Sequence, residues 1–302
     1  MLILVLFAGC EKTPPPESSH PYSRQSSIIK PEVFAQSIVS TELPEFAISF
    51  SPDGKTVYFN SASADRSVLK IMESRFENGQ WQPPTEMSFS DGTYRDVDPF
   101  VTPDGSRLYF SSNRPANNND STGDFDTWYV ERTEGGWSEP QNPGIPLNSE
   151  ANEIFVSVAR NGSIYFSSDA RGEDYSDIYR SQLVDGIYQQ PELLALKKDG
   201  EMLNFGNPLI SPDERFLILA ANTPDGLGGA DLFISYNRSG KWSEAQNLGE
   251  TVNSKYTDFA PCLSPDGKYL FFTSERPGVV PEGAVEGRPP GDIFQIDLPT
   301  VP

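Results

Sequence analysis

Acidic residues recur at one position of a repeating sequence pattern. Each stands seven residues before the second residue of a short turn such as SPDG at 51–54 or 264–267. The residues at this position are Glu45, Asp96, Glu153 and Asp258, with Phe205 replacing the acid once. Two carboxylates that face each other across a pocket can hydrolyse a glycosidic bond, one as acid and one as base or nucleophile. Acid–base hydrolysis is therefore the first chemistry to consider.

The repetition of these acids also allows two other roles. If the side chains point inward, they would form an acidic ring that binds a partner. A residue that recurs in nearly every unit can also build the unit, here by accepting backbone hydrogen bonds where a strand begins. Catalysis would require one pair about 5–10 Å apart that differs from its equivalents in the other units.

Histidine chemistry is excluded from the repeat region. The single histidine, His20, precedes the first repeat, so Ser-His-Asp catalysis, Cys-His catalysis and His-ligated zinc have no residues there. Cys262 lies in the apolar run FAPCLS and is expected to be a buried thiol. We expect no cofactor.

Calcium is the one metal that the sequence allows, and only weakly. Asp120, Asp124 and Asp126 in DSTGDFD could supply oxygen ligands, but their spacing is not that of an EF-hand. A solvated acidic loop is the preferred interpretation.

Other repeated residues are expected to be structural. An aspartate opens the third strand of four units, and it could pair with loop amides or with a nearby arginine. The aspartates are Asp126, Asp177, Asp231 and Asp292, and the arginines are Arg114, Arg171 and Arg276. One turn position carries Trp81, Trp137, Tyr188 and Trp242, and sharing a repeat position favours packing over carbohydrate stacking.

These residues must be positioned by a unit that repeats five times. The second residue of the turn recurs at intervals of 51 to 57 residues, as Pro52, Pro103, Arg160, Pro212 and Pro265. The strand after each turn, such as RLYFSS at 107–112, is apolar at successive positions, which predicts burial on both faces. Each unit has four expected strands, as in the blade of a propeller.

The two ends of the repeat region predict how the ring closes. The last unit lacks a fourth strand, whereas residues 39–54 align without gaps with 252–267. The segment before the first unit should therefore supply the missing outer strand and remove the open edge. The fold expected is all-β: a five-bladed β-propeller of four-stranded antiparallel blades, closed by the N-terminal strand completing the last blade.

Two units depart from the usual turn, and one face carries long loops. The third unit has VARNG and the fourth has SPDER, and we expect both changes to affect turn geometry alone. The loops at 113–126 and 275–292 lie on the same face as the repeated acids, opposite the tight turns. Binding concentrates on the long loops of a rigid scaffold, so this face, with the four acids and three arginines, is the candidate partner-binding face.

The repeats resemble those of the TolB-like, WD-related propellers of bacterial envelope proteins. The longest match, SGKWSEAQNLGETVNSKYTDFAPCLSPDGKYLFFTSERPG, spans 239–278, and the resemblance covers nearly all of 35–298. It implies the propeller fold but little about function, because the family includes scaffolds, secretion accessories and non-catalytic domains of peptidases.

The N-terminus and the charge suggest a location. MLILVLFAGC resembles a lipoprotein signal, which predicts a signal peptide at 1–9, lipidation of Cys10, a flexible tether at 10–30 and a single propeller domain at 31–302. The apolar run is too short to span a bilayer, so the alternative is an ordinary secretory signal peptide. Glu11 favours the periplasmic side of the outer membrane. The formal charge of −20 argues against a nucleic-acid partner.

These observations predict a non-enzymatic envelope lipoprotein. Its propeller would bind a protein or glycan partner on the loop-rich face, and its contact with the membrane would be through the lipid anchor. The alternative is a carbohydrate-active, glycosidase-like enzyme that uses channel carboxylates.

Overall fold

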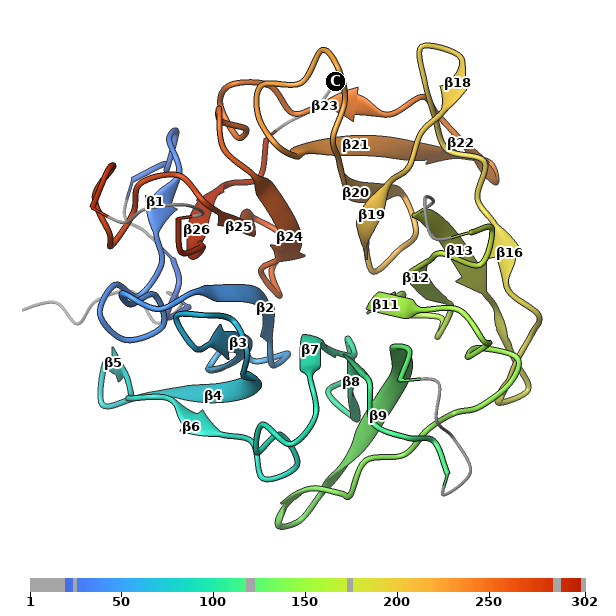
Figure 1. Cartoon of the computed structure of the whole chain (residues 1–302), viewed down its shortest axis with the longest axis horizontal. Coiled ribbons are helices and arrows are strands. Elements are labelled where there is room, and N and C mark those ends of the chain that lie inside the picture. Colours follow the sequence, from blue (N-terminus) through green and yellow to red (C-terminus); the bar gives the residue numbers. More distant parts are fainter. Residues whose placement is uncertain (1–19, 24–25, 118–122, 173–175, 285–288, 300–302) are drawn as a thin grey trace, which may run out of the picture.

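The protein is an all-β ring of five blades around a central axis (Figure 1). The computed structural model describes residues 20–23, 26–117, 123–172, 176–284 and 289–299. Signal residues 1–9, Cys10 and Asp120 lie outside these ranges. None of the described residues belongs to a helix long and apolar enough to cross a membrane.

Each blade is an antiparallel sheet whose strands follow one another from the axis outwards. Blade 1 contains β2 (Glu45–Phe50), β3 (Thr56–Ala62), β4 (Leu69–Glu77), β5 (Gln80–Trp81) and β6 (Thr85–Glu86). Blade 2 contains β7 (Asp96–Val101), β8 (Arg107–Ser112), β9 (Asp126–Thr133) and β10 (Gly136–Trp137). Blade 3 contains β11 (Glu153–Val158), β12 (Ile164–Ser168), β13 (Asp177–Ser181) and β16 (Glu192–Leu193).

The remaining strands complete the ring and add two small hairpins. Blade 4 contains β19 (Gly206–Ile210), β20 (Phe216–Ala221), β21 (Asp231–Arg238), β22 (Lys241–Trp242) and β23 (Gln246–Asn247). Blade 5 contains β24 (Asp258–Leu263), β25 (Tyr269–Ser274), β26 (Asp292–Asp297) and β1 (Glu32–Val33). The hairpins are β14 (Leu183–Val184) with β15 (Ile187–Tyr188), and β17 (Lys197–Lys198) with β18 (Glu201–Met202). In blades 1 and 4 the outer strand is split into two short pieces, each pairing with the third strand.

The predicted five-bladed propeller is confirmed. The first strands β2, β7, β11, β19 and β24 surround the axis (Figure 1), and each contacts the first strands of both neighbouring blades. The second strands β8, β12, β20 and β25 are buried along almost their whole length, because each lies between two neighbouring blades.

The N-terminal segment closes the ring as predicted. In β1, Glu32 pairs with Gln295 and Val33 with Phe294 of β26, and the amide of Phe34 continues the ladder to the carbonyl of Ile293 at 2.8 Å. Blade 5 is therefore built from both ends of the repeat region, and the edge of β26 is paired with β1 at the closure.

The packed domain begins earlier than expected. Within the predicted tether at 10–30, Tyr22 and Ile28 are buried, and the ring of Tyr22 packs edge-on against Phe50 and Phe271. Burying the ring of Tyr22 at the junction that closes the ring of blades is more favourable in free energy than leaving it exposed to water in a tether. Residues 20–23 and 26–30 thus belong to the domain, and the rest of the predicted tether lies outside the described residues.

The hydrophobic core is divided among the blade interfaces. Separate apolar clusters lie between blades 1 and 2, between 2 and 3, and between 3 and 4, while the largest joins blades 4, 5 and 1 to the N-terminal segment. Cys262 is in this largest cluster as a free thiol, as predicted, and burial raises its pKa to about 12.

The two unusual turns meet each other, which corrects the expectation that they affect turn geometry alone. Glu214 takes the place of the turn glycine at φ 56°, a conformation that costs energy for a residue with a side chain. Its carboxylate accepts hydrogen bonds from Asn161 in the altered turn of blade 3 at 2.6 Å and from Tyr165 at 2.6 Å. It also pairs with Arg180 at 2.9 Å. The two departures from the repeat thus form one inter-blade contact.

Candidate functional site

The four repeated acids are buried at the start of the first strands. Their exposed fractions are 2%, 1%, 2% and 0% for Glu45, Asp96, Glu153 and Asp258. The first strands bring the acids to one end of the ring, but their carboxylates face protein groups rather than an open mouth.

Three of these carboxylates accept hydrogen bonds from the backbone four residues earlier. Glu45 accepts from the amide and hydroxyl of Thr41 at 2.8 and 2.6 Å. Glu153 accepts from the amide and hydroxyl of Ser149 at 2.9 and 2.6 Å, and Asp258 binds Ser254 in the same way at 2.6 and 2.9 Å. The acid therefore fixes the loop that enters each blade.

Arginines complete two of these junctions. Arg114 pairs with Asp96 at 2.6 Å, and Arg276 pairs with Asp258 at 2.7 Å. Each guanidinium also lies over aromatic rings, about 5 Å from their centres, which suits a planar cation. Arg171 differs, because it pairs with Asp177 at 2.6 Å and not with Glu153.

No arginine of the described residues pairs with Glu45 or Glu153, and both acids have raised pKa values. Burial raises the pKa of Glu45 and of Glu153 to about 7, although the hydrogen bonds from Thr41 and Ser149 oppose the shift. A raised pKa can mark a catalytic acid. Here both carboxylates accept hydrogen bonds from the loop that precedes their strand. This is the structural role, support of the strand start, that the sequence also allowed.

The third-strand aspartates are engaged in the same manner. Asp126 accepts from Asn142 at 2.7 Å, Asp231 from Asn247 at 2.7 Å, and Asp292 from the amide of Val279 at 2.8 Å. The sequence suggested that these aspartates pair with loop amides or with an arginine. Asp292 binds a loop amide and Asp177 pairs with Arg171, whereas Asp126 and Asp231 accept hydrogen bonds from asparagine side chains. Asp124 and Asp126 lie on one loop, but no three acidic, histidine or cysteine side chains of the described residues form a metal-binding group.

A second repeat position lies two residues after the acid position in every blade, at the wall of the central channel. The backbone has positive φ there, and the pairing register shifts in every blade. The residues at this bulge position are Ala47, Asp98, Phe155, Asn207 and Ala260. Their side chains differ from blade to blade, in contrast to the acids that precede them.

The amide of each bulge residue donates to a side chain of the preceding blade. In four blades the acceptor lies on a second strand, as with Asn60, which accepts from Asp98 at 2.7 Å, and Ser111, which accepts from Phe155 at 3.2 Å. Blade 4 has Ala220 at the acceptor position, so Asn207 accepts the amide of Ala260 at 3.3 Å instead. The side chain of Asn207 therefore has a structural role.

Phe155 crosses the channel. It is buried in a cluster with Ala47 and Ala260, which belong to blades 1 and 5 on the other side of the ring. Phe46 and Phe259 pack against the same cluster. The alanines leave space that one aromatic ring fills, and the ring blocks the axis at this level.

Asp98 is the chemically distinctive residue of the channel. Its carboxylate makes no hydrogen bond or ion pair with the described residues, and desolvation by burial alone raises its pKa to about 7. The side chain nevertheless keeps part of its surface exposed. An unpaired carboxylate in a poorly hydrated wall is costly, and a cation from outside would compensate it.

The other end of the channel is apolar. A cavity of about 190 Å³ opens near the tight turns and is lined by all five blades. The residues at one shared position of its wall are Phe50, Val101, Val158, Ile210 and Leu263. The channel thus has an acidic end at Asp98 and an apolar end, with Phe155 above the apolar cavity.

Sequence reasoning singled out the acids that begin the first strands and did not single out Asp98. The first acid of each strand recurs because it holds the blade together, whereas Asp98 breaks the pattern of its equivalents. An alignment of the five units shows Ala, Asp, Phe, Asn and Ala at this position, and that departure was the available signal. Trp128, Trp137 and Trp242 contribute to blade packing, as expected.

Comparisons with known proteins support the fold. No protein-family model matches the chain, and no curated protein is similar to it in sequence. A putative TolB from Agrobacterium tumefaciens is 16% identical, with a TM-score of 0.51 over 86% of this chain and 92% of that protein. An α-L-arabinofuranosidase from Lactobacillus brevis is 14% identical, with a TM-score of 0.55 over 86% of this chain and 92% of that enzyme.

A third structure is longer than this chain. TolB from Acinetobacter baumannii is 14% identical with a TM-score of 0.47, and the match covers 85% of this chain but 55% of that protein. The TolB-like β-propeller fold inferred from the repeats is confirmed. Proteins of this fold include a glycosidase as well as TolB proteins, so the fold leaves the activity undecided.

Proposed function

We propose that this protein is a non-enzymatic binding protein of the bacterial cell envelope. It captures a partner polypeptide at the loop-rich end of its channel, where Asp98 receives a lysine or arginine of the partner. Lipidation of Cys10 anchors it on the periplasmic side of the outer membrane. The supporting observation is Asp98, whose carboxylate has no hydrogen-bond or ion-pair partner among the described residues. It stands in the channel wall where the other blades carry Ala, Phe, Asn and Ala.

The chemistry of the channel favours binding over hydrolysis. Hydrolysis of a glycosidic bond by the usual route needs two carboxylates facing one another, and Asp98 is the one acid among the five bulge residues. The buried acids at the start of the strands are committed to loops and arginines. A carboxylate whose pKa is raised by desolvation gains most from a cation that replaces the lost hydration.

The glycosidase alternative rests on the fold shared with the arabinofuranosidase and on the pKa of Asp98, which suits a general acid. It requires a second carboxylate near Asp98. Release of arabinose from arabinan by the purified protein, lost in Asp98→Asn, would establish this alternative and overturn the binding proposal.

Capture from native envelope extract tests the proposal. The tagged protein is crosslinked at pH 8 and partners are identified by mass spectrometry, with Asp98→Asn as the test variant and Asp91→Asn as the control. Asp91 is an exposed acid in the loop leading to the same strand, so both variants lose one negative charge. We expect Asp98→Asn to reduce recovery of the partner roughly tenfold or more and Asp91→Asn to leave it unchanged. Equal recovery with all three proteins would contradict the proposal.

A further inference from the structure

Four blade junctions are covered by an aromatic side chain from the turn between the third and fourth strands. Trp137 packs against Tyr58 of the preceding blade, with ring centres 5.9 Å apart, and Trp242 against Tyr165 at 6.4 Å. The hydroxyl of Tyr188 forms a hydrogen bond with the hydroxyl of Tyr109 of the preceding blade, and the two oxygens are 3.0 Å apart. Trp81 packs against Phe34 of the N-terminal segment, which in turn packs against Phe271 of blade 5.

Among the described residues, the junction between blades 4 and 5 has no such cover. Blade 5 takes its outer strand β1 from the N-terminal segment, and its described residues include no hairpin like those that carry the aromatic residues of the other blades. The position equivalent to Tyr58, Tyr109 and Tyr165 is Ile218. The strand exchange that closes the ring therefore leaves one junction different from the other four.

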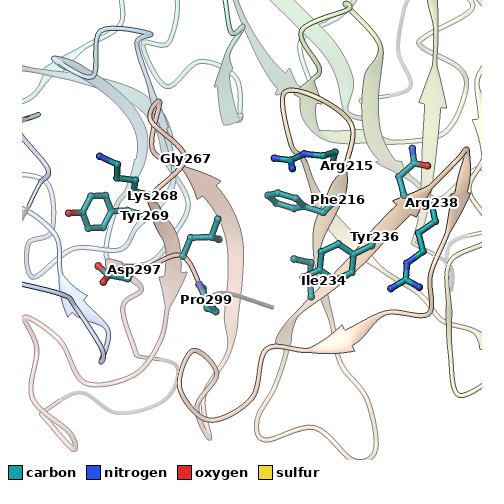
Figure 2. A pocket seen from close by; sticks show the side chains of 12 residues that line it. Arg215, Phe216, Ile234, Tyr236, Arg238, Gly267, Lys268, Tyr269, Asp297 and Pro299 are labelled. Carbon is teal, nitrogen blue, oxygen red and sulfur yellow. The ribbon is translucent and has the colours of Figure 1, made fainter. Parts of the chain in front are cut away.

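A groove of about 700 Å³ lies at this junction. Figure 2 shows Phe216, Ile234 and Tyr236 on the blade 4 wall and Pro299 on the blade 5 wall, and the ring of Tyr269 points away from blade 4. The volume is within the range of small-ligand and side-chain pockets, and it is large enough to accept an aromatic side chain with its flanking residues.

Blade 4 departs from the repeat on its wall of the groove. The positions of Phe216, Ile234 and Tyr236 correspond to Thr56, Glu73 and Arg75 in blade 1, where Glu73 and Arg75 form an ion pair at 2.7 Å. In blade 2 two of the same positions form the Arg107–Glu131 ion pair at 2.8 Å. Blade 4 thus presents apolar and aromatic groups where other blades are charged, on the one junction that lacks an aromatic cover.

The rim of the groove is positively charged in a protein of net charge −20. Arg215 and Arg238 stand at the opening on the blade 4 side (Figure 2). Arg215 has an exposed partner, Asp213 at 2.5 Å, and such a surface pair contributes little. Arg238 is exposed and forms no ion pair within the described residues.

We infer that this groove is a docking site for a polypeptide segment of a partner protein that carries an aromatic side chain beside acidic residues. The aromatic ring occupies the place that Trp137 and Trp242 fill at other junctions and contacts Phe216, Ile234 and Tyr236. The acidic residues pair with Arg215 and Arg238. This site lies on the tight-turn side of the ring and is separate from the Asp98 end of the channel.

Labelled model peptides test the inference by fluorescence polarisation on the full chain. The probe is fluorescein-GSGDDWDDGSG, with two matched peptides in which the Trp is replaced by Ala or the four Asp by Lys. We expect the probe to bind, and the Ala peptide to bind at least tenfold more weakly because the apolar contact is lost. The Lys peptide should also bind at least tenfold more weakly.

Protein variants identify the groove as the binding place. The triple variant Phe216→Thr, Ile234→Glu, Tyr236→Arg installs the residues of blade 1, which this fold already accommodates, and should weaken binding at least tenfold. Arg215→Ala with Arg238→Ala should weaken it about threefold to tenfold. Lys55→Ala with Arg75→Ala, two cations of blade 1, is the control and should leave it unchanged. Circular dichroism melting confirms that each variant folds.

Several outcomes would overturn the inference. These are equal binding of the Trp and Ala peptides, undiminished binding by the folded triple variant, or no binding of the probe at millimolar protein. Binding that appears only after deletion of residues 1–19 would show that this chain's own leading segment occupies the groove, and would also overturn it.

Discussion

At the scale of single residues, the repeat separates two kinds of carboxylate. Glu45, Glu153 and Asp258 are each tied to the serine or threonine four residues earlier, so their recurrence reflects the construction of the blade. Asp98 lies two residues farther along its strand and has no partner within the described residues. This departure from the repeat is the observation on which the proposed binding site rests.

Asp98 should destabilise the free protein at alkaline pH. Its folded-state pKa of about 7 is above the ordinary value of 3.8, so the folded state binds the proton more tightly and loses stability as pH rises from about 4 to 7. We expect Asp98→Asn to raise the free energy of unfolding by about 2 kcal/mol at pH 8, since one pKa unit corresponds to about 1.4 kcal/mol and the partly exposed carboxylate keeps some hydration.

This gain should shrink toward zero as the pH falls to 4 and below, because the carboxyl group is then protonated in the folded state and increasingly protonated in the unfolded state. Urea unfolding at pH 8, 6 and 4 measures it, with Asp91→Asn as the control for simple loss of charge. A gain that is the same at all three pH values, or a loss at pH 8, would show that burial does not raise the pKa of Asp98.

At the scale of elements, the turns and the closing strand hold the blades together. The sequence predicted the blade count, the register of the first strands and the closure by β1, because turn residues and apolar patterns are local signals. It did not predict that Asn161 and Glu214 meet, because the two turns belong to different blades and their proximity depends on the ring. Nor did it predict the burial of Tyr22, which follows a run of proline and polar residues.

The Asn161–Glu214 contact should appear as coupling between two turns. Asn161→Ala and Glu214→Ala are compared singly and together, since alanine keeps the cost of positive φ at 214 largely unchanged. We expect a coupling of about 1 kcal/mol in the free energy of unfolding, because both changes remove the same hydrogen bond at 2.6 Å. Strictly additive effects in urea denaturation would contradict the contact.

Tyr22 should contribute to closure of the ring. It is fully buried against Phe50 and Phe271, and a Cβ added to Gly54 would come within 2.6 Å of its ring. We expect Tyr22→Ala to lower the free energy of unfolding by about 3–5 kcal/mol. Tyr94→Ala, at a side chain that is 38% exposed, is the control and should cost about 1 kcal/mol or less. Similar denaturation midpoints for the two variants would show that residues near 22 form a tether.

At the scale of the whole molecule, the ring presents chemically different surfaces. One end of the channel carries Asp98, the other is an apolar cavity lined by five blades, and the groove beside blade 5 exists because the ring is closed by a strand from the N-terminal segment.

The proposed anchor predicts the distribution of the protein in cells. Cys10→Ala removes the thiol that would carry the lipid, so the variant should leave the membrane fraction and appear in the soluble envelope fraction. Cys262→Ala, at a buried thiol in the propeller, is the control and should remain with the membrane. Immunoblots of fractionated cells measure both. Unchanged fractionation of Cys10→Ala would contradict lipidation.

The most direct test of the central claim is the pH dependence of partner affinity. Once the captured partner is purified, calorimetric titration between pH 8 and pH 5 compares the wild type with Asp98→Asn. The wild-type affinity should fall by up to about tenfold per pH unit below 7, because protons compete with the partner's cation for the carboxylate. The affinity of Asp98→Asn should be lower at pH 8 and nearly independent of pH. The same pH dependence in both proteins would contradict the assignment of Asp98 as the binding residue.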